Sequence, residues 1–545
     1  MLQSKPARTR IAAFALVLLA ATFVLALGLL GACSSSPTVA EEAAESPHPT
    51  QVIIAMGKSS EPEAGFNPIL NWGAGEHMHE PLIQSTLFST TVAMGFENDL
   101  ATSYASSDEG LTWTFSLRDD VVFTDGVPLT AHDVAFTFNA ILTNPASEVD
   151  LSMVDSVVAP DDETVVMTLN KPFNALLYTL AVIGIVPEHA FDSSYGDNPI
   201  GSGRYMLEQW DKGQQVILVA NPSYYGVPPA MERVIVVFMD EDAALAAARA
   251  GQVDLAATSA VYSGQTIEGF ELLAFATVDS RGISLPTPAA GGTTADAEGR
   301  EYAVGNAVTS DRAIRQAINC AVDRELMIEN VLNGYGSVAY SVSDGMPWAA
   351  EQLVVKQDSA RARQLLDEAG WVPGEDGFRS RDGVEAAFTV WYPASDSVRQ
   401  GLANEFANQM KGIGLKVSAE GAGWDEIYSH QFSSPILWGW GSNAPTELYH
   451  LYYSTGSANF SRYESATLDE QYDEALTQNQ VEDSYRHWQL GTAEVGPEAA
   501  ATWVWLANVD HLYFARDDLN VAEQKLHPHG HGWAVANNVD QWTWK

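Results

Sequence analysis

Two clusters of histidine carry the clearest metal-binding chemistry in the sequence. The first is Glu76-His77-Met78-His79-Glu80, and the second is His527-Pro528-His529-Gly530-His531. Imidazole is a common ligand of nickel, copper and zinc, and short His-rich tracts suit these ions. Two histidines two residues apart point to different faces of a helix, however, and both tracts are also typical of polar loops. We therefore commit to no metal site and expect no bound cofactor. The candidate metal ligands are His77, His79, His527, His529 and His531.

A single cysteine lies where acylation chemistry requires one. Residues 1–10 carry three basic side chains and no acid, residues 11–30 are apolar, and Leu30-Gly31-Ala32-Cys33 follows. This order is that of a secretory signal, and its last four residues resemble the bacterial lipobox, whose cysteine is acylated after cleavage. We expect residues 1–32 to be a signal peptide with its lipobox, Cys33 to be lipidated and residues 33–50 to be a disordered tether.

An uncleaved transmembrane anchor is the alternative for residues 11–30, because about 20 apolar residues span a bilayer. Both readings place the rest of the chain outside the cytoplasm and attached to the cell membrane.

Composition excludes several classes of protein. The chain has 28 Lys and Arg against 70 Asp and Glu, a net charge of −42, which argues against nucleic-acid binding and against docking on anionic lipid through a basic patch. Two cysteines exclude a disulfide scaffold and a cysteine-rich metal site. The sequence also lacks the Gly-x-Ser-x-Gly and His-Glu-x-x-His motifs of hydrolases. We predict that the protein is not an enzyme.

The elements that position these residues alternate between strand and helix, which favours an α/β fold. Thr130 and Asp133 have the spacing of a capping box at the start of a helix. Two helices are expected between Ser310 and Gly336, with a break near Asp323. Further helices are expected at residues 358–368 and 402–413. Strands are expected where apolar and β-branched residues run together, at residues 52–55, 111–117, 165–169, 216–219, 234–238, 415–417 and 437–441.

Short motifs recur in a fixed order along the mature chain. They include Trp113-Thr114-Phe115, Phe123-Thr124-Asp125-Gly126, Gly201-Ser202-Gly203-Arg204-Tyr205, Asn221-Pro222-Ser223-Tyr224-Tyr225, Gly251-Gln252-Val253-Asp254-Leu255, Val322-Asp323-Arg324, Glu368-Ala369-Gly370-Trp371 and Gly439-Trp440-Gly441. The series resembles the signature of family 5 solute-binding proteins, the peptide- and nickel-binding group of ATP-binding cassette (ABC) importers.

The resemblance implies a two-lobed periplasmic-binding-protein-like α/β fold, of type II and the large cluster C form, with a discontinuous first lobe. Residues 51–300, including an inserted subdomain at about 96–200, would form lobe one together with the return segment 510–545. Residues 301–509 would form lobe two, and a solute bound between the lobes would stabilise the closed state.

The loop after Gly441 departs from the family pattern. The resemblance implies an Asp here that pairs with a peptide's amino terminus, but the sequence reads Ser442-Asn443-Ala444-Pro445-Thr446-Glu447. Glu447 could substitute if the loop turns it inward, and Asn443 can both donate and accept hydrogen bonds. Trp438 and Trp440 could pack on a ligand, and we expect one of them to face each way. The predicted ligand-binding residues are thus His77, His79, Trp438, Trp440, Asn443 and Glu447.

Taken together, the sequence predicts a monomeric substrate-binding lipoprotein that captures an oligopeptide-class solute for an ABC permease and its ATPase. A nickel or other metal-chelate ligand is the alternative, although residues 176–187 lack the arginine that the resemblance implies for a chelate's carboxylates. A ligand-sensing receptor component and a secreted hydrolase are alternatives of another class.

Overall fold

The computed structural model describes residues 50–74, 77–107, 110–295, 299–478, 480–530 and 532–545, which belong to one compact unit that begins at His48. The predicted signal peptide, Cys33, nearly all of the predicted tether and His531 therefore lie outside the described residues, as does the side chain of His77. No helix within the described part is long and apolar enough to cross a membrane.

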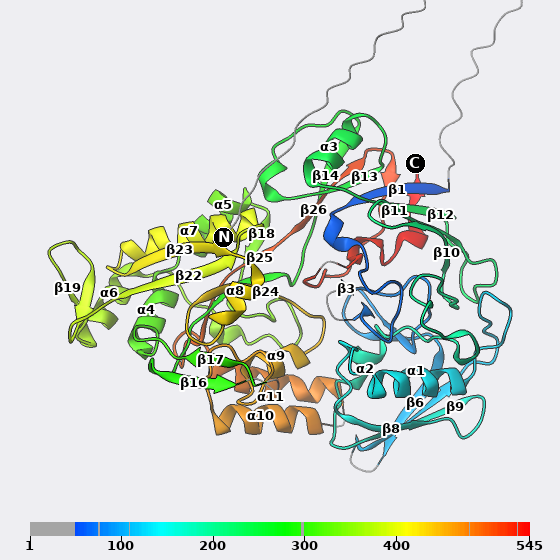
Figure 1. Cartoon of the computed structure of the whole chain (residues 1–545), viewed down its shortest axis with the longest axis horizontal. Coiled ribbons are helices and arrows are strands. Elements are labelled where there is room, and N and C mark those ends of the chain that lie inside the picture. Colours follow the sequence, from blue (N-terminus) through cyan, green and yellow to red (C-terminus); the bar gives the residue numbers. More distant parts are fainter. Residues whose placement is uncertain (1–49, 75–76, 108–109, 296–298, 479, 531) are drawn as a thin grey trace, which may run out of the picture. The chain divides into compact units, whose positions relative to one another are not determined.

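A seven-stranded sheet contains strands from both ends of the chain. Its order is β10-β11-β12-β1-β13-β26-β14, and the strands are β1 (Gln51–Met56), β10 (Tyr205–Asp211), β11 (Gln215–Ala220), β12 (Arg233–Phe238), β13 (Leu255–Thr258), β14 (Phe270–Phe275) and β26 (His511–Arg516). Strand β1 runs parallel to β12 and β13, whereas β26 inserts antiparallel between β13 and β14. The helix α3 (Glu241–Arg249) packs on β1 and β13 (Figure 1).

A six-stranded sheet consists of strands from the second half of the chain. Its order is β18-β25-β15-β24-β22-β23, with β15 (Ser280–Ser284), β18 (Gly336–Val338), β22 (Ala387–Pro393), β23 (Lys416–Ala422), β24 (Ile436–Trp440) and β25 (Trp503–Val509). Strand β15 pairs with β24 and β25, although it precedes residue 300.

Four helices of the second half start at aspartate caps. They are α4 (Arg312–Ala321), α5 (Arg324–Leu332), α6 (Ser359–Glu368) and α7 (Ser397–Lys411), and their N-cap side chains Asp311, Asp323, Asp358 and Asp396 each accept a hydrogen bond from a backbone N–H of the first turn. The predicted break near Asp323 is therefore confirmed. Helix α7, which covers β22 and β23, starts before the predicted residue 402, because Asp396 caps it.

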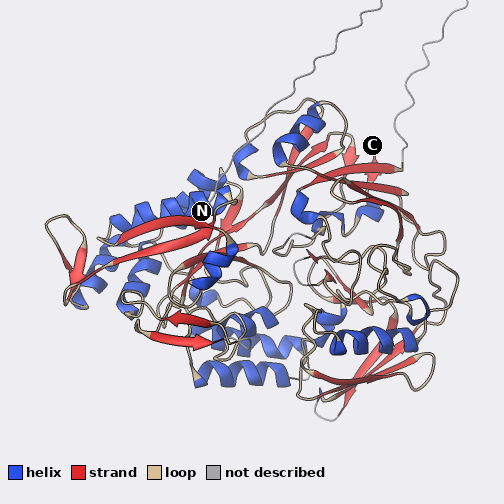
Figure 2. Cartoon of the chain, in the orientation of Figure 1, coloured by secondary structure: helices blue, strands red, loops and turns tan. Residues whose placement is uncertain are grey.

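Four further helices follow in chain order: α8 (Trp424–Ser429), α9 (Thr446–Tyr452), α10 (Ala466–Thr477) and α11 (Val481–Ala493). The last two lie side by side, as Figure 2 shows.

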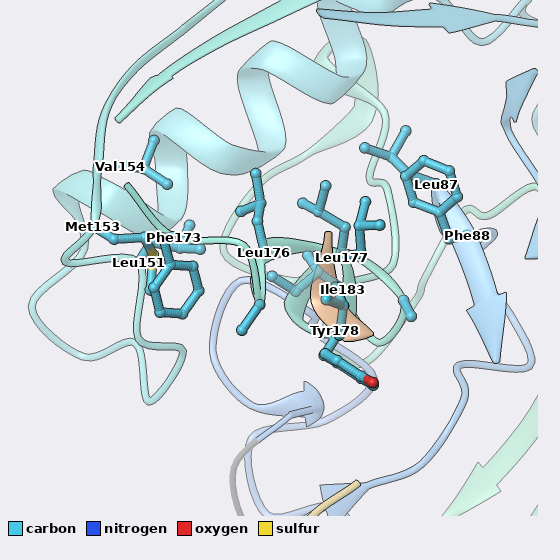
Figure 3. Packing of buried hydrophobic residues seen from close by; sticks show 14 of the residues in the cluster. Leu87, Phe88, Leu151, Met153, Val154, Phe173, Leu176, Leu177, Tyr178 and Ile183 are labelled. Atoms are coloured by element: carbon cyan, nitrogen blue, oxygen red, sulfur yellow. The ribbon is translucent and has the colours of Figure 1, made fainter. Parts of the chain in front are cut away.

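A four-stranded antiparallel sheet lies within residues 96–200. Its order is β6 (Ala101–Ser107), β7 (Thr112–Leu117), β9 (Thr164–Leu169) and β8 (Val154–Val158), and α1 (Ala131–Thr143) packs against it. The backbone N–H of Thr130 donates to Asp133, which confirms the predicted capping box. Figure 3 shows the apolar cluster beside α1, in which Leu176, Leu177 and Tyr178 of α2 (Leu176–Leu180) pack near Phe173.

Short elements complete the fold. They are the strands β2 (Trp72–Gly73), β3 (His77–Met78), β4 (Phe88–Thr90), β5 (Phe96–Asn98), β16 (Gly292–Ala295), β17 (Glu301–Val304), β19 (Val372–Pro373), β20 (Arg379–Arg381), β21 (Val384–Glu385), β27 (Leu519–Asn520) and β28 (Thr543–Trp544).

Two chain segments cross between the large sheets. Residues 276–279 connect β14 to β15, and Asp510 connects β25 to β26. The crossings are hydrogen-bonded to each other, since Thr277 Oγ1 donates to the Val509 carbonyl at 2.8 Å and the Val509 N–H donates to the Asp279 carbonyl at 2.9 Å. The sheets therefore meet at a double connection, and the residues around it come from both sheets.

Candidate functional site

Three cationic or titratable side chains converge on Gly439, near the end of strand β24. A Cβ built on this glycine would collide with Nη2 of Arg399 and would lie 2.7 Å from Cε1 of His529 and 2.9 Å from Nη1 of Arg281. Arg281 comes from β15, Arg399 from the first turn of α7, and His529 from the C-terminal segment after β26. Glycine lets all three approach the strand because it has no side chain.

Arg399 is only partly neutralised. Its Nη1 donates to the Asp396 carboxylate at 2.9 Å, but its Nε is buried and has no hydrogen-bond partner among the described residues. Burial first, and then the neighbouring Arg281 guanidinium, lower the pKa of Arg399 to about 10. The ring of Trp424, the first residue of α8, lies 5.9 Å from the guanidinium carbon of Arg399. An anionic group would relieve both the desolvation and the repulsion of the two arginines.

Asp279 contacts several basic side chains near the double connection. It forms an ion pair with Arg281, accepts from His529 Nδ1 at 2.5 Å, and lies 3.4 Å from His511 Nε2. Burial raises the pKa of Asp279, but Arg281 and then His529 outweigh it, and the pKa ends well below its usual value. Asp279 is therefore a carboxylate that ties both crossings to the site.

The loop after β24 is held from inside by Glu447. The Gly441 N–H donates to Glu447 Oε1 at 2.9 Å, so the loop does turn this side chain inward. Burial raises the pKa of Glu447 to about 8, so the carboxyl is neutral at pH 7. Asn443 Nδ2 donates to the Leu526 carbonyl at 3.3 Å, while Asn443 Oδ1 and Trp440 Nε1 are buried without a partner in the described part of the chain.

Trp438 and Trp440 lie on the same side of β24, so the expectation that one faces each way was wrong. Both contact Phe460, with ring centroids 4.2 and 6.2 Å apart. Residues two apart in a strand share a face, and it is Gly439 between them that turns toward the arginines. Trp438 is buried, and its Nε1 donates to Ser284, whereas Trp440 is half-buried.

The histidines do not gather into one site. His79 is buried beside Trp72, with ring centroids 4.3 Å apart, and His527 is buried against His511 and Gln524. Within the described ranges, no group of three or more His, Cys, Asp or Glu side chains could hold a metal ion. Of the predicted histidines with a described side chain, His529 alone reaches the Gly439 cluster.

Sequence reasoning missed Asp279, Arg281 and Arg399. Arg281 lies in a five-residue strand that is buried throughout, and a buried arginine needs a partner, but this burial is known only from the structure. Arg399 follows a capping aspartate on a helix, where it is indistinguishable from an exposed arginine without knowledge of the sheet beneath it.

Comparison with known proteins gives a consistent picture. Residues 95–462 match the family described as bacterial extracellular solute-binding proteins, family 5. The chain is 33% identical over 510 residues to protein XP55 of Streptomyces lividans, covering 87% of this chain and 86% of that protein. It is 26% identical to the oligopeptide-binding protein AppA of Bacillus subtilis, covering 94% and 96%.

Among solved structures, NikZ of Campylobacter jejuni in complex with Ni(L-His) superimposes with a TM-score of 0.73 at 25% identity, covering 91% of this chain and 99% of that one. AppA of Bacillus subtilis, in complex with a nonapeptide, superimposes with a TM-score of 0.68 at 22% identity and with the same coverage. The predicted α/β periplasmic-binding-protein fold of the cluster C type is confirmed.

Proposed function

Because the chain belongs to family 5 of the bacterial extracellular solute-binding proteins, we propose that it captures a peptide-class solute with a free carboxylate for an ABC importer. A family 5 protein is a binding component of transport, so the prediction that the chain is not an enzyme is confirmed. The importer's permease and ATPase are its expected partners.

The unpaired guanidinium atoms beside Gly439 carry this proposal. The Nε atoms of Arg281 and Arg399 are both buried without a hydrogen-bond partner among the described residues. Buried donors left unpaired are costly, and an arginine fork matches a carboxylate in geometry and charge. A carboxylate placed beside Gly439 would pair with Arg399.

The two large sheets support a lobe-closing mechanism. We place lobe one on the seven-stranded sheet and lobe two on the six-stranded sheet, with the crossings at residues 276–279 and 510 as the hinge. The Gly439 cluster combines side chains from lobe two with His529 from the C-terminal segment. A solute bound there contacts both parts, so it binds the closed state more tightly than the open one.

A binding experiment tests the proposal. Calorimetry in buffer with EDTA compares a pool of short random peptides with free carboxyl ends against the same pool amidated at that end. The free pool should bind, the amidated pool should bind much more weakly, and Arg399→Gln should weaken binding of the free pool by about 10- to 100-fold. Arg361→Gln, the same change at an arginine half-exposed on α6, is the control and should bind as the wild type does. Failure of both pools, or equal binding of both, would refute the proposed ligand.

Metal-chelate capture is the second candidate, favoured by the likeness to NikZ in complex with Ni(L-His) and by the 27% identity to the nickel-binding periplasmic protein of Escherichia coli. A chelate also presents carboxylates to Arg399, and it would bind only when the metal is present. The peptide proposal stands first because a free carboxylate by itself satisfies the unpaired Nε of Arg399, without any metal.

We further propose that the protein is anchored outside the cytoplasm by acylation of Cys33. The basic start, the apolar run and the Leu-Gly-Ala-Cys sequence support this. Cells fed labelled palmitate should label the wild-type chain but not Cys33→Ser, and label on the variant would refute the anchor.

A further inference from the structure

We propose that His529 is a second ligand contact: its Nε2 accepts a hydrogen bond from the free ammonium group of the solute whose carboxylate pairs with Arg399. The inference rests on the proposed function and narrows it to solutes that carry both groups close together. It gives His529, which the sequence suggested only as a candidate metal ligand, a role in contacting the solute directly.

Contacts with lobe two and with the hinge fix the position of His529. Its backbone N–H donates to the Gly441 carbonyl at 2.8 Å, and its Nδ1 meets Asp279 Oδ1 at 2.5 Å. Its Cε1 lies 2.7 Å from the point where a Cβ of Gly439 would be. The imidazole is thus clamped at the strand end that also holds Arg399.

The partner of Nδ1 determines which nitrogen carries the proton. Asp279 is ionised, because the charge of Arg281 and the hydrogen bonds from His511 and His529 lower its pKa against the effect of burial. A carboxylate only accepts, so Nδ1 must donate. Burial first lowers the pKa of His529 despite the opposing effect of Asp279, so the ring is neutral at pH 7. In a neutral ring with its proton on Nδ1, Nε2 carries a lone pair.

That lone pair is available to a ligand. Nε2 of His529 has no hydrogen-bond partner among the described residues, and the side chain is 30% exposed. Asp279 behind the ring strengthens Nε2 as an acceptor. Glu447, the carboxyl group that follows β24, cannot serve instead, because the Gly441 N–H occupies it and burial keeps it neutral.

The distance between the two contacts sets the ligand class. Arg399 and His529 both reach Gly439, one with Nη2 and one with Cε1, so a bound carboxylate and a bound N–H lie within a few ångströms of each other. Free amino acids and short peptides with unblocked ends have this arrangement. A neutral imidazole could also coordinate a metal ion, and the test separates the two cases.

The experiment uses the same random pool of short peptides with free carboxylates, in a free-amine form and an N-acetylated form, in EDTA. The wild type should bind the free-amine pool at least about 10-fold more tightly. His529→Leu should abolish that preference and keep the preference for free over amidated carboxyl ends. His529→Gln, whose side-chain oxygen can still accept a hydrogen bond, should restore part of the preference for free amines. His132→Leu, at an exposed position on α1, is the matched control and should keep both preferences.

The outcomes separate this inference from the proposed function. Carboxylate selectivity without amine selectivity in the wild type overturns the inference alone, as does a folded His529→Leu that still prefers free amines. A preference that appears only with added Ni²⁺ and disappears in EDTA assigns Nε2 to a metal and also overturns it. Binding of no pool refutes the proposed function and the inference together.

Discussion

At the scale of single residues, burial decides the charge state of Glu447. The sequence identified it as a possible ionic partner for a ligand, since it is the first carboxyl group after Gly441. In the structure it is buried, accepts from the Gly441 N–H and has its pKa raised to about 8 by burial. A neutral carboxyl that shapes the loop can be replaced by an amide, whereas an ionic contact cannot.

Replacing Glu447 with Gln should therefore preserve ligand binding at pH 7 and change the dependence of stability on pH. In the folded wild type the proton remains bound up to about pH 8, whereas the unfolded chain releases it near 4.5. The unfolded state binds fewer protons in this window, so Glu447 makes the free energy of unfolding fall as pH rises from about 5 to about 8. Over this pH window, Glu447 should lower the free energy of unfolding by on the order of 3 kcal/mol.

Denaturant unfolding of wild type and Glu447→Gln at several pH values within this window measures the difference. The variant should gain stability relative to wild type with rising pH. A constant difference between the two curves would show that Glu447 is ionised in the fold.

At the scale of elements, strand pairing places Gly439 and Gly441 in different roles. Gly439 faces the ends of long side chains, whereas a Cβ on Gly441, which has φ +156°, would collide with the backbone carbonyl of Val278. Side-chain ends can shift, but the crossing segment cannot without disturbing both sheets. The same added methyl group should therefore affect binding at one position and folding at the other.

Gly439→Ala should lower ligand affinity by about 10-fold or more with little change in melting temperature, because it displaces Arg399 and His529. Gly441→Ala should lower the melting temperature by several degrees. Gly264→Ala, with no atom within 4 Å of the added carbon, is the control for both measurements. If Gly439→Ala and Gly441→Ala changed ligand affinity and melting temperature equally, the assignment of Gly439 to binding and Gly441 to folding would be wrong.

The elements themselves were largely predictable. Hydrophobic periodicity located strands such as β12 and β24, and capping residues located the starts of α1, α5 and α6. The direction of Trp438 and Trp440 was mispredicted because the alternation rule was applied to residues two apart. The neighbours of Gly439 could not be read from any period, since they come from three other segments.

At the scale of the whole molecule, net charge opposes compactness. A charge of −42 makes the folded chain repel itself, and ion pairs such as Lys58 with Asp240 leave this net charge unchanged. Dissolved salt screens this repulsion over about 10 Å at 0.1 M.

The melting temperature should accordingly rise when NaCl is increased from about 20 mM to about 500 mM. Scanning calorimetry of the chain without residues 1–32 measures it, with an equal osmolality of sucrose as the uncharged control. A falling or flat curve in NaCl would mean that local ion pairs outweigh the net charge.

The sequence by itself determined the α/β class, the family resemblance and the predicted export of the chain, because these depend on local periodicity, local motifs and composition. Only the tertiary structure brought together Asp279, Arg281, Arg399 and His529 beside Gly439. These residues are separated by up to 250 positions, and their contacts arise when β15 pairs with β24 and the C-terminal segment returns to Gly441. Strand register and chain crossing set such distances, and neither leaves a pattern in neighbouring residues.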